Sequence, residues 1–210
     1  MKKSLLALAA LATIAAAGSA FAQTNVTIYG VVDAGLVKDI HGGTNAAASA
    51  ANPFPASTPN ASNRLDSGLQ NGSRLGFRGT EALGGGLSAI FNLEAGFNVD
   101  TGTSAQGGAL FGRQAWVGLQ GDFGTVKLGR QQTVVYQNSG TFDPFGDTLA
   151  GDSARLINYA GSRTNNTIGY SINAAGVRGE IDYGFGEVAG DSKAGRYIGG
   201  NLGYANGPID

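Results

Sequence analysis

Apolar and polar residues alternate along most of the chain beyond residue 25. The longest alternating run extends from Leu87 to Phe97, where Leu, Ala and Phe occupy every second position. A period of two residues is that of a β-strand, whose successive side chains point to opposite faces, and not that of a helix. The pattern predicts eight strands, at residues 26–36, 73–80, 87–97, 114–120, 125–129, 167–172, 177–185 and 197–204.

The connections between these strands differ in length. Tight turns are expected at residues 84–86, 121–124 and 174–176, whereas residues 38–72 and 131–165 form long segments. Short turns at one end of the strands and long loops at the other are typical of outer-membrane barrels. A soluble β-sandwich also alternates, but its connections need not be sorted in this way. The sequence therefore predicts an all-β fold, specifically a transmembrane antiparallel β-barrel.

The composition agrees with a sheet that meets lipid on one side. Glycine makes up 36 of 210 residues, and cysteine is absent. After Ala22 no apolar run reaches the ~20 residues that a spanning helix needs, and the apolar residues are spread thinly. This distribution is unusual for a globular core and normal for a barrel with one apolar face.

The N-terminus has the features of an export signal. Lys2 and Lys3 precede an apolar run at residues 4–17, and Ala20 and Ala22 have the spacing that signal peptidase accepts. We expect residues 1–22 to be a cleaved signal peptide and residues 23–210 to be the barrel segment. A transmembrane anchor is disfavoured because the run is shorter than ~20 residues.

The charge balance argues against nucleic acid as a partner. Without the two lysines of the signal, 12 Lys and Arg remain against 15 Asp and Glu, and no basic run of five appears. A nucleic-acid-binding protein would show a basic patch or stripe.

Several segments resemble the Gram-negative general porins, in particular their betaproteobacterial branch. Residues 26–35 (VTIYGVVDAG) resemble the first strand of that family, and residues 73–81 (SRLGFRGTE) resemble the second. Residues 113–119 (RQAWVGL) and 121–131 (GDFGTVKLGRQ) resemble the fourth and fifth. The resemblance runs from the signal to Pro208 and so covers nearly the whole chain.

This resemblance implies a homotrimer of 16-stranded barrels in the outer-membrane lipid, each passing small hydrophilic solutes and ions passively. It implies no cofactor and no metal. The third extracellular loop of such proteins folds inward, and here it is expected within residues 131–165, centred on Asp143 to Asp147. Complete porins are far longer, so we expect this chain to be the N-terminal half, as a fragment or a truncated gene product.

The residues expected to carry function are charges across a constriction, since rings of charge in a narrow aqueous pore bias which ions enter. Arg74, Arg78 and Lys127 fall on the polar face by parity. By resemblance, they face acids on the third loop and set up a transverse field. The alternative is solvated surface charge. The full set of candidates is Arg74, Arg78, Lys127, Arg130, Asp143, Asp147 and Asp152.

The alternation of inward and outward positions does not by itself place Arg113 and Arg130 satisfactorily. Strict alternation places both on the lipid face, where an Arg at the midplane costs roughly 2–4 kcal/mol. They are expected either at the extracellular rim or turned inward by a bulge, and the family pattern favours a structural or pore-facing role for Arg130. Glu94 and Asp33 are expected on the inward face, where they tune selectivity or pair with nearby arginines.

Two other functions compete with a channel. An enzyme is disfavoured because His41 is the one histidine and there is no cysteine, metal-ligand spacing or phosphate-binding loop. The second rival is a surface barrel that acts as an adhesin or structural protein without conductance. Conductance distinguishes this rival from a porin.

Overall fold

The structure is a computed structural model that describes residues 25–39, 62–146 and 161–204. The predicted signal peptide at residues 1–22 lies outside the described residues, as do His41, Asp147 and Asp152. No helix in the described ranges is long and apolar enough to cross a membrane.

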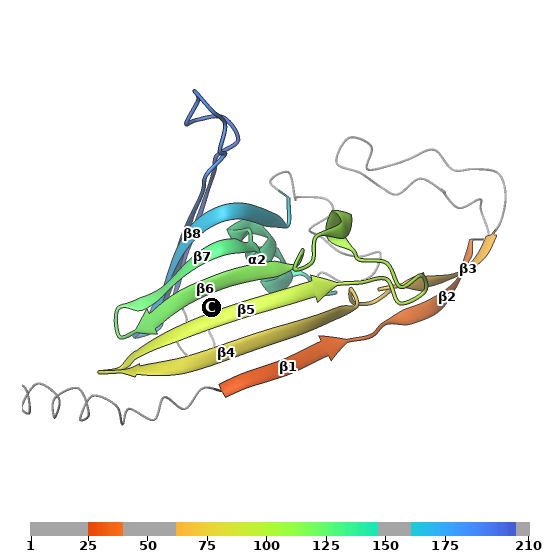
Figure 1. Cartoon of the computed structure of the whole chain (residues 1–210), viewed down its shortest axis with the longest axis horizontal. Helices are drawn as coiled ribbons and strands as arrows, with labels where there is room; N and C mark the ends of the chain where they lie inside the picture. Colours follow the sequence, from red (N-terminus) through yellow and green to blue (C-terminus); the bar gives the residue numbers. More distant parts are fainter. Residues whose placement is uncertain (1–24, 40–61, 147–160, 205–210) are drawn as a thin grey trace, which may run out of the picture.

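Eight strands form one antiparallel sheet in which neighbours follow one another along the chain, except that β2 and β3 intervene between β1 and β4 (Figure 1). The order is β1-β4-β5-β6-β7-β8-β9-β10, which confirms the predicted all-β antiparallel fold. Within the described residues, β1 and β10 are the two edges and do not pair with each other. The bounds are β1 Asn25–Val31, β4 Arg74–Gly84, β5 Leu87–Gly96, β6 Gln114–Gly121, β7 Gly124–Gln132, β8 Arg163–Ala174, β9 Val177–Gly184 and β10 Tyr197–Tyr204.

The first predicted strand is interrupted, which corrects the expectation of one strand over residues 26–36. Strand β1 ends at Val31, and the chain resumes as β2 (Ala34–Asp39), which pairs with β3 (Ser62–Ser67) in a separate two-stranded sheet. Asp33 causes the break, because its carboxylate accepts the backbone N–H groups of Gln70 and Asn71 at 2.8 and 2.6 Å. A side chain bonded to the backbone in this way competes with the strand ladder. Asp33 therefore holds a turn and does not pair with an arginine in the described contacts.

The eight-stranded sheet has one apolar and one polar face. Apolar residues at alternate positions are solvent-accessible, with Ile28 67%, Ile181 58% and Leu202 82% exposed. Among the described residues, Val134 is the one buried hydrophobic side chain, whereas Glu94, Gln131, Thr167 and Asp182 are buried polar ones. We call the side that carries Tyr29, Glu94, Lys127 and Asp182 the polar face. In the described sheet the buried side chains are mainly polar and the exposed ones include many large apolar residues, which is the reverse of a soluble protein.

The short connections have the predicted turn chemistry. Gly85 and Gly86 have positive φ angles of 59° and 79° in the turn between β4 and β5. Ala175 and Gly176, with φ angles of 51° and 83°, join β8 to β9. Positive φ at both central residues is the geometry of the tight hairpin turn that matches the twist of paired strands.

The long segment after β7 contains a helix that the pattern did not predict. Helix α2 (Val134–Phe142) begins after Thr133, whose side chain accepts the backbone N–H of Tyr136. This is an N-cap, which satisfies one of the free N–H groups of the first turn. The helix lies against β9 and β10, and Figure 1 shows it close to the end of β7. The inward-folding third loop of a closed barrel remains a prediction.

Candidate functional site

The polar face is organised in rows that run across the strands. Residues directly opposite each other in an antiparallel pair lie on the same face, close to one another. One row consists of Tyr29, Gly76, Glu94 and Gln114 from four successive strands. A second row is Gly118, Lys127, Gly169, Asp182 and Gly199. Large polar residues thus alternate with glycines, which leave room for the neighbouring side chains.

Glu94 joins two arginines at one end of the polar face. Its Oε1 atom accepts a hydrogen bond from Arg113 Nε at 2.6 Å, and its Oε2 atom lies 4.0 Å from Arg74 Nε. Arg74 also donates to Asn71 Oδ1 at 2.9 Å. A charge-assisted hydrogen bond of 2.6 Å is stronger than a neutral one, so Glu94 holds the Arg113 guanidinium at the wall, whereas it attracts Arg74 as a longer ion pair.

Arg78 lies four residues along β4 from Arg74, on the same face. It is opposite Thr27 on β1 and Asn92 on β5. Its guanidinium carbon lies 5.4 Å from the centre of the Tyr29 ring, which is within cation–π range. The structure therefore brings Arg74 and Arg78 together around Tyr29 and Glu94.

Lys127 belongs to a separate group further along the polar face. Its ammonium lies 3.3 Å from Glu180 Oε1 and 5.8 Å from the centre of the Trp116 ring. Trp116 in turn donates from Nε1 to Gln114 Oε1 at 2.9 Å. These contacts hold the Trp116 ring on the polar face.

Arg130 lies near the loop end of β7. It pairs in register with Ala115, a residue of the apolar face, and a register shift follows between Gly129 and Gln131. Its Nε donates to Gly112 O at 2.8 Å, and its Nη1 donates to Asn165 Oδ1. The assignment of Arg130 to the pore wall stays a prediction.

Asp143 follows the last residue of α2 and is bound within its own turn. Its backbone N–H donates to Ser139 O at 2.9 Å, and its Oδ1 accepts the backbone N–H of Phe145 at 2.8 Å. Of the three loop acids predicted to face the wall, it is the one within the described residues. The acids that contact Arg74 and Lys127 come from the wall itself, namely Glu94 and Glu180.

Helix α2 is held against the polar face by side chains of β9 and β10. Tyr197 Oη accepts the backbone N–H of Val134 at 3.1 Å. Two further contacts join the helix to the wall: Asn201 Nδ2 donates to Asn138 Oδ1 at 3.1 Å, and Gln137 Nε2 donates to Glu180 Oε1 at 3.4 Å. The helix therefore lies on the side of the sheet that carries the charges.

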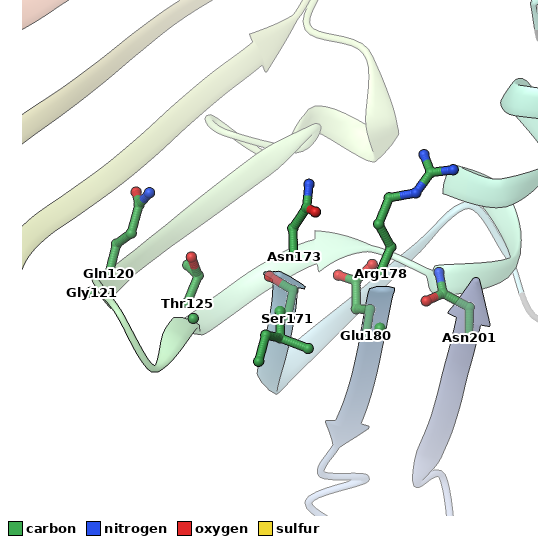
Figure 2. Close-up of a pocket in the computed structure, with 11 residues that line it drawn as sticks. Gln120, Gly121, Thr125, Ser171, Asn173, Arg178, Glu180 and Asn201 are labelled. Carbon is green, nitrogen blue, oxygen red and sulfur yellow. The ribbon is translucent and has the colours of Figure 1, made fainter. Parts of the chain in front are cut away.

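A hollow of about 320 Å³ lies on the polar face between the ends of β6 and β10. Figure 2 shows the labelled polar side chains, among them Thr125, Asn173 and Glu180, pointing to the same side of the ribbons. Five of the lining residues form one register row: Gln120, Thr125, Ser171, Glu180 and Asn201. The hollow is lined mainly by hydrogen-bonding side chains, and Arg178 also lines it.

Sequence reasoning did not assign Arg113, Arg163 or Glu180 to the site. Arg113 precedes β6, so strand parity does not fix its direction. Arg163 Nε donates to Arg113 O at 2.8 Å, and its guanidinium lies 5.8 Å from the centre of the Tyr136 ring. Glu180 stands two residues from Asp182 in an alternating segment, and this spacing was the available signal.

Comparison with known proteins gives consistent matches. A family model described as Gram-negative porin matches residues 7–210. An outer membrane porin protein of Bordetella pertussis is 38% identical over 100% of this chain and 58% of its own length. Outer membrane porin protein 32 of Delftia acidovorans is also 38% identical, again over 100% of this chain and 58% of its own length. The chain thus spans less than two thirds of these relatives.

A solved structure has the same arrangement of strands. The anion-selective porin from Comamonas acidovorans superposes with a TM-score of 0.67 at 32% identity, covering 89% of this chain and 55% of its own. A likeness of this extent and identity places the sheet within the same kind of barrel.

Proposed function

The chain belongs to the Gram-negative porin family, and on that premise we propose that it forms part of a channel for passive diffusion of small hydrophilic solutes and ions. Its place is the bacterial outer membrane. The eight strands described here supply one part of the barrel, since the relatives are longer than this chain. Diffusion through such a channel requires no bond chemistry.

The observation that carries this proposal is the reversal of the two faces. Ile28, Ile181 and Leu202 are exposed on one side, whereas Glu94 and Asp182 are buried on the other. In lipid the outward face of a barrel is apolar and the lumen is polar. Closing the sheet into a barrel with α2 inside would place the charged rows around an aqueous path.

We propose that the basic residues of the wall set the ion preference. Arg74, Arg78 and Lys127 lie on the polar face, and Glu94 links Arg113 to Arg74. Fixed charges beside a narrow path with low-dielectric walls bias which ions enter. Arg130 at the loop end of β7, together with Asp143, Asp147 and Asp152, completes the proposed constriction.

We further propose that the complete protein assembles as a homotrimer. The exposed apolar face supports this assembly, because such side chains need lipid or a neighbouring barrel to cover them. The assembled unit would place three pores in the membrane.

Liposome swelling tests passive diffusion directly. The protein from the complete reading frame is reconstituted, and swelling is followed in sugars of increasing size, from a pentose to a tetrasaccharide. We expect rates that fall as the sugar grows, whereas heat-denatured protein gives none. Folded, inserted protein that admits not even the pentose would favour a surface barrel without conductance.

A further inference from the structure

A second hollow, of about 400 Å³, lies on the polar face where β1, β4, β5 and β6 run side by side. Its volume falls in the range of small-molecule sites, roughly 300–1,000 Å³. Two register rows supply most of its side chains. One row is Thr27, Arg78, Asn92 and Trp116, and the other includes Asn25, Thr80 and Ile90.

Arg78 gives this hollow a positive charge without a matching negative one. Its guanidinium makes no hydrogen bond or ion pair with any residue that the structure describes, and its carbon lies 5.4 Å from the centre of the Tyr29 ring. Lys127, in contrast, pairs with Glu180 at 3.3 Å. No acidic side chain lines the hollow, and Arg78 is exposed. The hollow therefore attracts an anion, and its guanidinium is accessible to one.

The neighbours of Arg78 hold it in place and add a donor. Thr27 and Asn92 stand directly opposite Arg78 on either side, so the three side chains are adjacent. The Thr27 hydroxyl makes no hydrogen bond with a described residue and can donate to the same anion. The Tyr29 ring lies against Arg78, and the Tyr29 hydroxyl lies 2.8 Å from Asn92 Oδ1. Contacts of this kind preorganise a site and reduce the entropy lost on binding.

Ile90 makes one side of the hollow apolar. It is the one aliphatic residue on the polar face of β5, where the other side chains belong to Ser88, Asn92 and Glu94. It stands opposite Gly118, which has no side chain to cover it. Trp116 lies diagonally across from Ile90 on β6 and lines the same hollow. A solute with an apolar body would gain by covering this side chain, because apolar surface leaves water.

We propose that this hollow binds a small organic carboxylate that carries an apolar ring. A guanidinium takes a carboxylate through two parallel N–H···O bonds, so Arg78 would hold the charged end with Thr27 beside it. The ring would lie over Ile90 and next to Trp116. An inorganic anion or a neutral ring satisfies only one half of the site. The inference names a class of solute for the proposed channel and in that sense rests on the proposed function.

Calorimetric titration of sodium benzoate tests the site. The folded protein from the complete reading frame is kept in a non-ionic detergent, and the heat of titration into micelles alone is subtracted. Sodium acetate, which lacks the ring, and benzyl alcohol, which lacks the charge, are titrated in the same way. We expect saturable binding of benzoate, at least fivefold tighter than either. Binding at equilibrium does not require conduction, so loss of this site and failure of the channel are separate results.

Two variants and one control define the location. Arg78→Gln removes the charge and should weaken benzoate binding at least tenfold. Ile90→Thr keeps the β-branched shape and should bring benzoate close to the affinity of acetate. Lys193→Gln removes an exposed charge from a turn and should bind as the parent does. Folding of each variant is checked by circular dichroism, and the three ligands compared on the parent decide the matter without any variant.

Three results would overturn the proposal. The parent could show no saturable binding of benzoate, or it could bind benzoate no more tightly than acetate. The third is a loss of affinity in Arg74→Gln as large as in Arg78→Gln. Arg74 lies four residues away on the same strand, so equal losses would mean that the general field of the wall attracts the anion.

Discussion

The hydroxyl of Tyr29 donates a hydrogen bond to Glu94 Oε2 at 2.9 Å, although β4 lies between their two strands. The contact is possible because Gly76 stands opposite both residues and carries no side chain. A Cβ atom on Gly76 would lie 2.3 Å from Tyr29 Cζ. The glycine-rich composition of the chain thus has a local cause on the polar face, where the tyrosine ring fills the glycine position.

Gly76→Ala should displace the Tyr29 ring and break its bond to Glu94. Because overpacking of this kind typically costs about 1–3 kcal/mol, we expect the free energy of unfolding to fall by that amount. Urea unfolding followed by circular dichroism measures it. Gly203→Ala is the matched control, since its Cβ would meet nothing within 4 Å. Equal losses of unfolding free energy in both variants would show that the position of the Tyr29 ring does not require a glycine at residue 76.

Replacing Arg74 and Arg78 with Gln should shift the reversal potential in a salt gradient toward cation preference. The change removes two positive charges from the polar face, and the shift should shrink at high salt as screening increases. Lys193→Gln removes an exposed charge from the turn after Asp191 and should leave the potential unchanged. An unaltered potential in the double variant would reject the assignment of Arg74 and Arg78.

Glu94→Gln should act in the opposite direction. It removes the carboxylate that Arg113 and Arg74 share, so the channel should become more anion-preferring. Breaking a buried pair also leaves an uncompensated charge, which costs about 3 kcal/mol. Reversal potential and urea unfolding measured on the same preparation test both effects. A shift of the reversal potential toward cation preference would contradict the proposal that Glu94 partly neutralises the arginines of the wall.

Tyr197→Phe should loosen the start of α2. The buried N–H of Val134 loses its acceptor, at a cost of about 1–3 kcal/mol. We expect larger fluctuations of the open-channel current in single-channel records. Tyr183→Phe removes a hydroxyl from the apolar face and should leave the current as quiet as in the parent. Identical noise in both variants would mean that the hydroxyl of Tyr197 does not hold the helix.

Alternation predicted the strands well because each face of this sheet meets a uniform environment. Seven of the eight predicted strands correspond to one strand of the main sheet, and the side of Arg74, Arg78, Glu94 and Lys127 followed from parity. The first strand was wrong at Asp33, where a side chain bonded to Gln70 and Asn71 outcompetes the ladder. Such long-range partners leave no trace in the local pattern.

Neither helix α2 nor the position of Arg113 could be predicted from the sequence, and the reasons are related. Helix α2 is nine residues long and is stabilised by Thr133 and by Tyr197, the latter 63 residues from its partner Val134. Arg113 lies just before a strand, where the period of two no longer applies, and its direction is set by Glu94 on the neighbouring strand. Contacts made across the sheet decided both features.

Planar-bilayer conductance of the protein from the complete reading frame tests the central claim most directly. We expect stepwise ohmic insertions, grouped in threes, whose reversal potential in a salt gradient then reports the ion preference. A silent bilayer, from protein shown by heat-modifiable migration and protease protection to be folded and inserted, would contradict a diffusion channel.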